Sequence, residues 1–256
     1  MSTSGRRVDH QRPCRAGNVP AACRPSELLT VNIDQILLLA RTSPHEEDKP
    51  LDVMTLFFTV LDRRRMTVRE IEKLGRSAID SNELFIDNLE VGDDEVVGQA
   101  GHGFKYLIDG LNSERIVVGL EGVGIGQAAL ELATAYANER VVFDRPIGQN
   151  QAVAHPLADS WIRLESARLM AMHAAELYDH HQNCGLQAAA AKYLGAEAGF
   201  DACDRAMSTH GGYAYAKEYH VERLWREARL LRNAPFSQEM VLNYISTQAL
   251  NLPRAY

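Results

Sequence analysis

Residues 111–127 read LNSERIVVGLEGVGIGQ, and they decide the class of fold. Apart from one glutamate and one glutamine, everything after Arg115 in this stretch is apolar or glycine. Such a run belongs in a protein interior, yet it opens with the charged pair Glu114 and Arg115. We therefore expect a helix over residues 112–140 that is apolar on nearly all sides and carries one carboxylate near its start.

Glycine is frequent in this expected helix, at positions 119, 122, 124 and 126. Each glycine in a helix interior costs about 1 kcal/mol relative to alanine. A helix that keeps so many glycines predicts that another backbone, or a ligand, approaches it closely.

Apolar residues spaced three and four apart continue along the chain and predict further helices. One stripe consists of Leu157, Trp161, Leu164, Ala167, Ala171, Ala174 and Tyr178. A second stripe consists of Ala189, Tyr193, Ala196, Phe200, Cys203 and Met207. Residues 183–185, NCG, form a short connection, so the two helices should be antiparallel neighbours. A fourth main helix is expected at about residues 237–250.

The part of the chain before these helices carries strand signals instead. Runs rich in aliphatic, aromatic and β-branched residues predict strands at 35–41, 54–61 and 83–91. Turn-forming residues separate the runs, and residues 92–103 read as a loop. The predicted fold class is mainly α: a partial β-strand module over residues 31–100, followed by an up-down four-helix bundle over residues 101–256.

The composition is that of an ordinary globular protein, with 46% hydrophobic and 24% charged residues. The formal net charge of −7 argues against a nucleic-acid partner. The cysteines form no CxxC pair and have no metal-ligand spacing, which predicts a reducing compartment and no metal site. No apolar run approaches the roughly 18 residues of a membrane span, so no span is expected.

The first 25 residues are rich in Arg, Pro and Ser and lack periodicity. An Arg-rich, acid-poor start is typical of an organelle transit peptide. Its prolines oppose an amphipathic helix and favour a disordered tail. We expect a disordered or atypical tail over residues 1–30.

Five stretches, taken in order, resemble the acyl-CoA dehydrogenase family, flavoenzymes that desaturate acyl-CoA thioesters. They are residues 36–43, 73–91, 99–130, 136–159 and 190–231. The resemblance implies the end of the family's β domain followed by its C-terminal helical bundle. It also implies FAD as cofactor, an electron-transfer flavoprotein or similar acceptor, and a homotetramer or homodimer. The implied location is the cytoplasm, or the mitochondrial matrix in a eukaryote.

The family reaction needs a carboxylate that removes the α-proton of the thioester. Most members hold it in a Tyr-Glu-Gly-Thr-like stretch, which corresponds to Ala234, Pro235, Phe236 and Ser237. Proline cannot take a proton. A minority of the family places the base in a Glu-Arg dipeptide at the head of the long helix, which Glu114 and Arg115 match. The resemblance therefore implies that Glu114 is the general base.

Glu114 has a second interpretation, as an acidic residue in a first helical turn that gains about 0.3–1 kcal/mol from the helix dipole. The proline at position 235 favours the base. Asn112 and Arg115 are then expected to contact substrate, with Arg115 as structural or electrostatic support. Glu239 is a weaker candidate base and is expected to face the flavin edge instead.

Arg140 and Phe143 match the family's Arg-x-x-Phe-Gly, whose arginine reaches the FAD pyrophosphate of the neighbouring subunit. Asp144 stands where the family usually has glycine. Gln151 matches a glutamine near the adenosine half of FAD. The alternatives are a cation at a helix C-terminus for Arg140 and a helix cap for Gln151.

His210, Gly211 and Gly212 match the family's His-Gly-Gly turn, where glycines let backbone amides approach the FAD diphosphate. His210 itself is expected to be structural, and a His-Gly-Gly sequence alone would indicate an ordinary helix C-cap. Ser208 replaces the common glutamine, which puts one FAD contact in question. Ser237 keeps a hydroxyl where the family has threonine. Ser237 and Glu239 complete the expected set of cofactor-binding residues.

The resemblance starts partway through the β domain and does not include the family's N-terminal helical domain. Two alternatives to an FAD-dependent acyl-CoA dehydrogenase are therefore carried forward. One is a truncated, non-catalytic remnant that oligomerises through its bundle. The other is an acyl-CoA oxidase.

Overall fold

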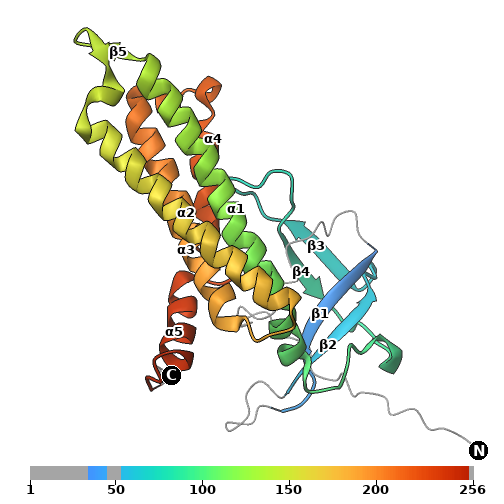
Figure 1. The fold of residues 1–256 in the computed structure, drawn as a ribbon. Coiled ribbons are helices and arrows are strands. Elements are labelled where there is room, and N and C mark those ends of the chain that lie inside the picture. Colours follow the sequence, from blue (N-terminus) through green and yellow to red (C-terminus); the bar gives the residue numbers. More distant parts are fainter. Residues whose placement is uncertain (1–33, 45–52, 254–256) are drawn as a thin grey trace, which may run out of the picture. The chain divides into compact units, whose positions relative to one another are not determined.

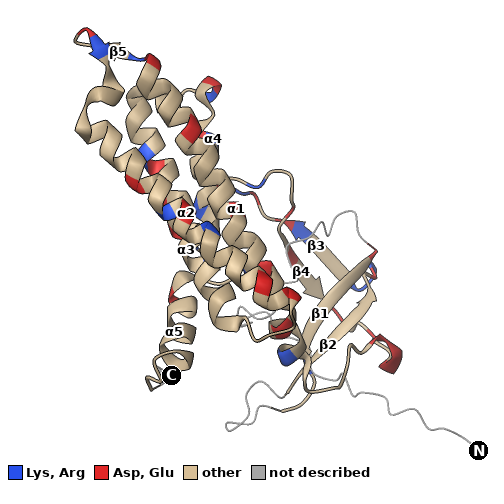
Figure 2. Ribbon diagram, in the orientation of Figure 1, with Lys and Arg blue, Asp and Glu red and all other residues tan. Residues whose placement is uncertain are grey.

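The computed structural model describes residues 34–44 and 53–253, and it divides the chain into two compact units, residues 1–110 and 111–256. The division falls at Gly110, inside a helix, rather than at residue 100. The tail expected over residues 1–30 lies outside the described residues. Acidic and basic residues are interspersed over the described part of each unit (Figure 2).

The first unit contains two small antiparallel sheets (Figure 1). β1 (Gln35–Arg41) pairs with β2 (Met54–Val60), and β3 (Met66–Glu70) pairs with β4 (Asn82–Ile86). The strand predicted at 35–41 is confirmed at both ends, and the one predicted at 54–61 ends one residue earlier. The strand predicted at 83–91 is shorter, because the chain leaves the sheet after Ile86.

The strand β3 was not predicted. Its sequence MTVRE buries only Met66, so it lacks a clear apolar alternation. The side chain of Met66 instead joins a small cluster with Ile36 and Leu61 that connects the strands of the first unit. A second cluster packs Leu39, Val53, Met54 and Leu56 against the first turns of the long helix.

The second unit is a helical bundle, as predicted. Its helices are α1 (Gly103–Glu139), α2 (Gln151–Asp179), α3 (Gly185–His210), α4 (Val221–Leu231) and α5 (Gln238–Gln248). α2 and α3 are antiparallel neighbours joined by a short connection, which confirms the reading of residues 183–185 (Figure 1). α4 is an additional helix beyond the four main ones expected, and it packs against α3.

Short elements connect the helices. A short hairpin follows α1, and each of its strands, β5 (Val141–Val142) and β6 (Arg145–Pro146), has two residues. The 3₁₀ turns are η1 (Asp93–Glu95), η2 (Ile147–Gln149), η3 (Gly211–Tyr215) and η4 (Lys217–Tyr219). η1 lies within the stretch 92–103 that was predicted as a loop.

α1 begins at Gly103 rather than at residue 112, because the expected loop already turns helical there. This correction changes the interpretation of Glu114, which lies well inside the helix. The dipole acts on charges within the first turn of a helix. The helix-end interpretation of Glu114 is therefore wrong.

Three glycines of α1 lie against the backbone of α3, a close approach that the frequency of glycine predicted. A Cβ atom added at Gly119 would come within 2.7 Å of the carbonyl oxygen of Ala191. Gly122 and Gly126 face the backbones of Gly195 and Gly199 in the same way. The two helices approach more closely than any side chain on these positions would allow.

α1 is long and apolar enough to pass a test for a membrane span by length and composition. This corrects the expectation that no apolar run approaches that length. A helix buried in a protein core passes the same test, and the contact of α1 with α3 explains its apolar sequence here. The absence of a span therefore remains a prediction.

The stripe predicted on α2 is buried only in part. Leu164, Ala167, Ala171 and Ala174 are buried, whereas Trp161 is 61% exposed and Tyr178 is also exposed. On α3 the buried surface is wider than one stripe, because α1, α2 and α4 all pack against this helix. Tyr193, Phe200 and Met207 are therefore only partly buried at its margins.

Candidate functional site

The predicted site residues fall into two groups at opposite ends of the bundle. Glu114, Arg115 and Ser237 belong to one end, and Arg140 and the His-Gly-Gly turn belong to the other. At a rise of 1.5 Å per residue, Glu114 and Arg140 are about 39 Å apart along α1. One chain therefore does not bring both groups to a single small-molecule site.

At the first end, the buried residue is Arg115, while Glu114 is exposed. The guanidinium of Arg115 donates to the Oδ1 atom of Asn112 at 2.9 Å. It also lies over the ring of Phe236, 4.8 Å from the centroid, and near the ring of Tyr244. Burial lowers the pKa of Arg115, and the aromatic rings compensate its charge.

These contacts bring the Glu-Arg turn of α1 against residues 232–237, which connect α4 to α5. The connection contains Pro235, whose peptide bond to Ala234 is cis. Ser237 is the N-cap of α5, and its hydroxyl accepts a hydrogen bond from the N–H of Met240 at 3.4 Å. The predicted role of Ser237 in cofactor binding thus competes with a capping role that the structure shows.

Glu239 is exposed in the first turn of α5. Hydrogen bonds from its own backbone N–H and from the Ser237 hydroxyl hold the pKa of this carboxyl below its usual range. A carboxylate stabilised in its charged form is a poor base, which weakens the second candidate further.

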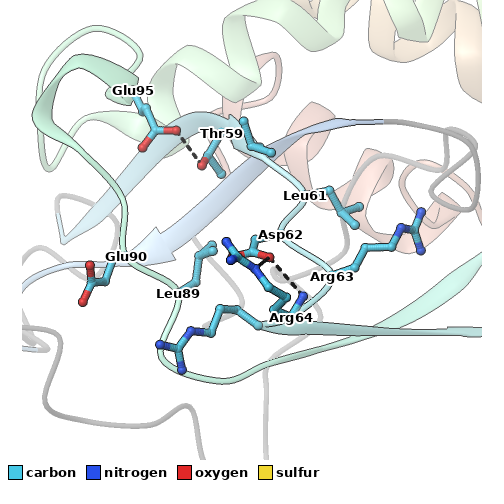
Figure 3. A pocket seen from close by; sticks show the side chains of 10 residues that line it. Thr59, Leu61, Asp62, Arg63, Arg64, Leu89, Glu90 and Glu95 are labelled. Carbon is cyan, nitrogen blue, oxygen red and sulfur yellow. Dashed lines mark hydrogen bonds and ion pairs between the residues drawn. The ribbon is translucent and has the colours of Figure 1, made fainter.

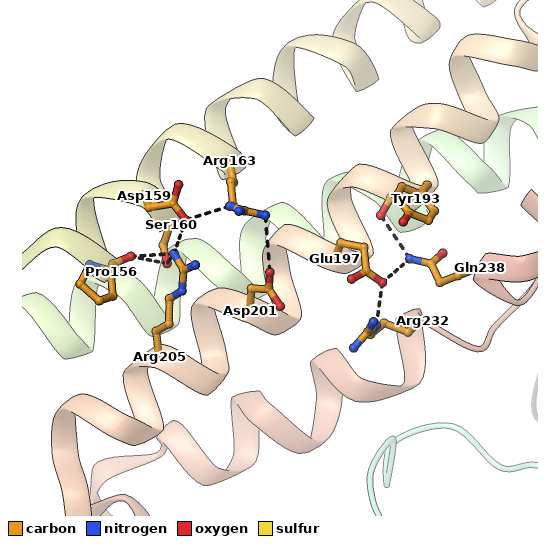
Figure 4. Close-up of polar contacts among 10 residues, drawn as sticks. All are labelled: Pro156, Asp159, Ser160, Arg163, Tyr193, Glu197, Asp201, Arg205, Arg232 and Gln238. Carbon is orange, nitrogen blue, oxygen red and sulfur yellow. Dashed lines mark hydrogen bonds and ion pairs between the residues drawn. The ribbon is translucent and has the colours of Figure 1, made fainter. Parts of the chain in front are cut away.

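Behind the same connection lies a polar network that the sequence did not single out. Gln238 is buried, and its Nε2 atom donates to a carboxylate oxygen of Glu197 at 2.8 Å. Arg232 donates to the same oxygen at 2.7 Å (Figure 4). Lys192, a lysine in an otherwise apolar part of α3, completes the network. A single lysine among alanines is the sequence feature from which this network could have been predicted.

At the other end, His210 is buried at the C-terminus of α3. Its Nδ1 lies 2.8 Å from the carbonyl oxygen of Ala206, so this nitrogen carries the proton. The ring stacks on Tyr136 with centroids 4.4 Å apart and meets Tyr219 edge-on. These contacts agree with the expected structural role of His210.

Gly211 caps α3 with φ of 59°, a conformation that glycine adopts without strain. A Cβ atom at Gly211 or Gly212 would meet nothing within 4 Å, so this backbone is open to a ligand. Capping and ligand approach are therefore compatible at this turn. Gln151, by contrast, is the exposed first residue of α2, and its neighbour Asn150 holds the cap position.

Arg140 directly follows α1 and is exposed, with its guanidinium 5.9 Å from the ring centroid of Tyr213 in the η3 turn. This contact joins the arginine motif to the glycine turn. Both tyrosines of this turn are exposed, Tyr213 by 48% and Tyr215 by 85%.

Phe143 and Asp144 form the tip of the β5–β6 hairpin, both with positive φ. Two such residues define the mirror-image turn that matches the twist of a hairpin. Asp144 tolerates this conformation, whereas a phenylalanine there is an outlier. Phe143 is also 93% exposed, which is unusual for so large an apolar side chain. The predicted contact of Phe143 with a cofactor stays a prediction.

A groove of about 500 Å³ lies between the start of α2 and the end of α3, next to Gln151. Ser208, Thr209 and Arg205 line it from α3. Arg205 donates to the backbone oxygen of Pro156 at 2.8 Å and pairs with Asp159 at 2.7 Å (Figure 4). Arg205 and then Arg163 lower the pKa of Asp159 through hydrogen bonds.

The first unit has a pocket of its own, about 520 Å³ in volume, between the β2–β3 turn and residues 89–95 (Figure 3). Asp62 pairs with Arg64 at 3.0 Å, and Thr59 donates to Glu95 at 2.7 Å. None of the predicted site residues lines it.

Within residues 34–44 and 53–253, no cluster of three or more His, Cys, Asp or Glu side chains is placed to hold a metal ion. Cys184 and Cys203 are free and buried. Burial raises the pKa of Cys203 to about 12, so this thiol is unreactive at neutral pH.

Residues 101–250 match the family model described as acyl-CoA dehydrogenase, C-terminal domain. The match covers more than half of the chain, and the chain belongs to the acyl-CoA dehydrogenase family.

Curated relatives match along part of their length. The chain is 43% identical over 176 residues to acyl-CoA dehydrogenase FadE12 of Mycobacterium tuberculosis, which covers 68% of this chain and 45% of the relative. It is 31% identical over 215 residues to the probable acyl-CoA dehydrogenase YdiO of Escherichia coli K12, covering 84% and 56%. The chain thus spans about half the length of the curated relatives it matches.

Solved structures agree in fold. An acyl-CoA dehydrogenase from Geobacillus kaustophilus superposes with a TM-score of 0.81 at 26% identity, over 87% of this chain and 58% of that one. Butyryl-CoA dehydrogenase from Megasphaera elsdenii gives 0.80 at 27% identity, over 87% and 57%. The prolyl acyl carrier protein oxidase AnaB also gives 0.80, at 25% identity, over 87% and 58%.

Proposed function

We propose that this chain carries the C-terminal part of an FAD-dependent acyl-CoA dehydrogenase in which Glu114 is the general base. The observation that carries the proposal is the contact between Arg115 and Phe236. It seats the turn that bears Glu114 against the connection that holds Pro235. Because proline has no group that accepts a proton, a carboxylate from α1 fills the role at this place.

In the proposed reaction, the α and β C–H bonds of an acyl-CoA thioester break and a double bond forms between the two carbons. A bound FAD would supply the acceptor for the β-hydrogen, which leaves as hydride. Glu114 takes the α-proton on its carboxylate. Arg115 and Asn112, which are hydrogen-bonded to each other, would hold the helix turn that aims this carboxylate. Their contact with the substrate belongs to the same proposal.

The residues at the far end of the bundle fit a dinucleotide. The backbone of Gly211 and Gly212 is open, and Arg140 stands beside that turn with its guanidinium exposed. Backbone N–H groups and a planar guanidinium suit the oxygens of a diphosphate. Since this end lies about 39 Å along α1 from Glu114, the dinucleotide bound here belongs to the site of a neighbouring subunit.

Glu114 is exposed in this chain, whereas a base that removes a carbon-bound proton must be shielded from water. The proposal therefore requires that substrate, cofactor or further protein cover this carboxylate in the active assembly.

An absorbance spectrum of the purified protein tests the proposal. Bound flavin should bleach on adding an acyl-CoA, and Glu114→Gln should keep the flavin but bleach about 10²–10⁴-fold more slowly. Glu131→Gln is the matched control, because Glu131 is exposed on the same helix away from the site. A Glu114→Gln protein that bleaches at the wild-type rate would rule out this base.

The second candidate is a non-catalytic member that oligomerises through its bundle. The exposed apolar side chains on α2, among them Trp161, Ile162 and Leu169, favour an assembly role. Protein that is colourless, and stays so with added FAD, would support this candidate. A yellow preparation would count against it.

The electron acceptor and the compartment are also part of this proposal. We take the acceptor to be an electron-transfer flavoprotein in the cytoplasm or the mitochondrial matrix. Because the oxidase AnaB shares the fold, fold alone does not distinguish a dehydrogenase from an oxidase. Hydrogen peroxide formed during turnover in air would favour an acyl-CoA oxidase.

A further inference from the structure

Lys192 is a charged residue that the proposed chemistry does not use. It lies in the first third of α3 and is 0% exposed. Its Nζ atom donates to the carbonyl oxygen of Phe236 at 2.5 Å and to the Oε1 atom of Gln238 at 3.1 Å. Burying an ammonium group costs free energy unless its hydrogen bonds are satisfied, so these two contacts account for its place in the core.

The charged groups around Lys192 come from every helix that meets at this point. Glu197 on α3 and Glu239 on α5 act on it through space. Arg232, directly after α4, pairs with Glu197 at 2.7 Å. Arg115 of α1 lies on the other side of Phe236.

Residues 232–237 are thus held at both ends by one turn of α3. Arg232 donates to the carboxylate of Glu197. Gln238, at the other end, donates to Glu197 and to the carbonyl oxygen of Tyr193 (Figure 4). It also accepts a hydrogen bond from Lys192. Between these anchors, Lys192 is the residue that bonds the backbone of the connection itself.

Phe236 is held from two sides as a result. Lys192 bonds its backbone carbonyl, and Arg115 covers its ring at 4.8 Å. A displacement of the Phe236 backbone therefore removes the surface on which Arg115 rests. Because Arg115 also donates to Asn112, the position of this turn of α1 depends on the connection.

We propose that Lys192 is a positioning residue that fixes residues 232–237 and, through Phe236 and Arg115, aims the turn of α1 that carries Glu114. Its relevance to catalysis rests on the proposed function. A lysine suits this role because its long stem reaches from one helix to a backbone carbonyl, and its ammonium can bond that carbonyl and the Gln238 amide at once. Without it, the carbonyl of Phe236, which is partly buried, loses this donor.

Amide hydrogen exchange of the whole chain tests the positioning directly and does not depend on activity. In Lys192→Met, exchange across residues 232–240 should be about 10-fold faster than in wild type, since loss of a hydrogen bond of about 1.4 kcal/mol opens the segment that much more often. Lys192→Arg, which keeps a cationic donor, should restore part of the protection.

Leu164→Val is the matched control, because it destabilises the contact of α2 with α3 without touching the connection. It should leave exchange across residues 232–240 unchanged relative to the rest of the bundle. Unaltered exchange in Lys192→Met, or equal acceleration in Leu164→Val, would overturn the proposal.

Kinetics with an acyl-CoA separate this proposal from the proposed function. Lys192→Met should lower kcat about 10-fold while changing KM less than about threefold, because misplacement of the base affects the transition state more than binding. Wild-type protein with no turnover would defeat the proposed function, and the exchange experiment would still decide the role of Lys192. Normal kcat in Lys192→Met would defeat the positioning role.

Discussion

At the scale of single residues, Lys192 and Arg115 show how this bundle keeps charge in its interior. The charged guanidinium of Arg115 contacts two aromatic rings and one amide oxygen. Lys192 has only a carbonyl and an amide as direct partners, so desolvation dominates its behaviour. Burial lowers the pKa of Lys192 from 10.5 to about 8, although Glu197 and Glu239 oppose the shift.

This shift predicts a pH dependence of stability. Between about pH 8 and 10.5 the folded state binds fewer protons than the unfolded state, so the free energy of unfolding rises with pH. The stabilisation is present in full above the unfolded pKa and is lost as the pH falls through about 8. Its size is at most about 3 kcal/mol.

Urea unfolding of wild type and Lys192→Met at several pH values from 7 to 10.5 measures this contribution. Other lysines and tyrosines titrate alike in both proteins, so the difference between the two free energies isolates Lys192. That difference should grow in favour of wild type as the pH rises. A difference that stays constant would show that Lys192 has an ordinary pKa.

At the scale of elements, the contact between α1 and α3 organises the bundle. Gly119, Gly122 and Gly126 face Ala191, Gly195 and Gly199 across it. Each glycine weakens its own helix, and the close approach of two apolar backbones compensates for this. The contact also explains why α1 is as long and apolar as a membrane-spanning helix and yet belongs to a protein core.

Glycine-to-alanine substitutions test this contact. Gly119→Ala places a methyl group 2.7 Å from the carbonyl oxygen of Ala191, which is backbone and cannot rotate away. It should lower the free energy of unfolding by about 1–3 kcal/mol, despite the better helix propensity of alanine. Thermal or urea unfolding of the purified variants gives the value.

Gly124→Ala is the internal control on the same helix, because a Cβ atom there meets nothing within 4 Å. It should stabilise the protein by up to about 1 kcal/mol. If both substitutions change stability in the same direction, helix propensity decides the outcome and the close contact does not.

The sequence predicted most of these elements, and its errors have physical causes. The sequence predicted β1 because a short apolar run of that length is typical of a buried strand. It predicted the glycine contact because glycines destabilise a helix unless another backbone packs closely against them. It missed β3, which buries one residue, and it missed the first turns of α1, which include Gly103 and Gly110.

The candidate site was accessible to sequence reasoning only where a motif marks it. Glu114, Arg140 and the His-Gly-Gly turn were found through the family resemblance. Lys192 and Gln238 were not, because their roles depend on contacts between segments more than 40 residues apart. Helical spacing likewise placed Trp161 in a buried stripe, although this side chain is 61% exposed in the described structure.

At the scale of the whole molecule, two features point to more than one chain. The Glu114 end and the Arg140 end lie about 39 Å apart along α1, too far for one dinucleotide site. The outer face of α2 exposes Trp161, Ile162 and Leu169. A patch of large apolar side chains on one helix face is typical of an interface between subunits.

Assembly and cofactor retention should therefore fail together. Leu169 is 62% exposed in the middle of this face, so Leu169→Glu would leave the isolated fold intact and bury a charge in the interface. Sedimentation should show a smaller species than wild type, and the protein should lose bound flavin, because Arg140 would no longer reach the diphosphate of a neighbour. Leu74→Glu, at an exposed leucine in the first unit, should change neither property. A Leu169→Glu protein that stays assembled would place the interface elsewhere, and one that dissociates yet remains yellow would mean that each chain binds its flavin alone.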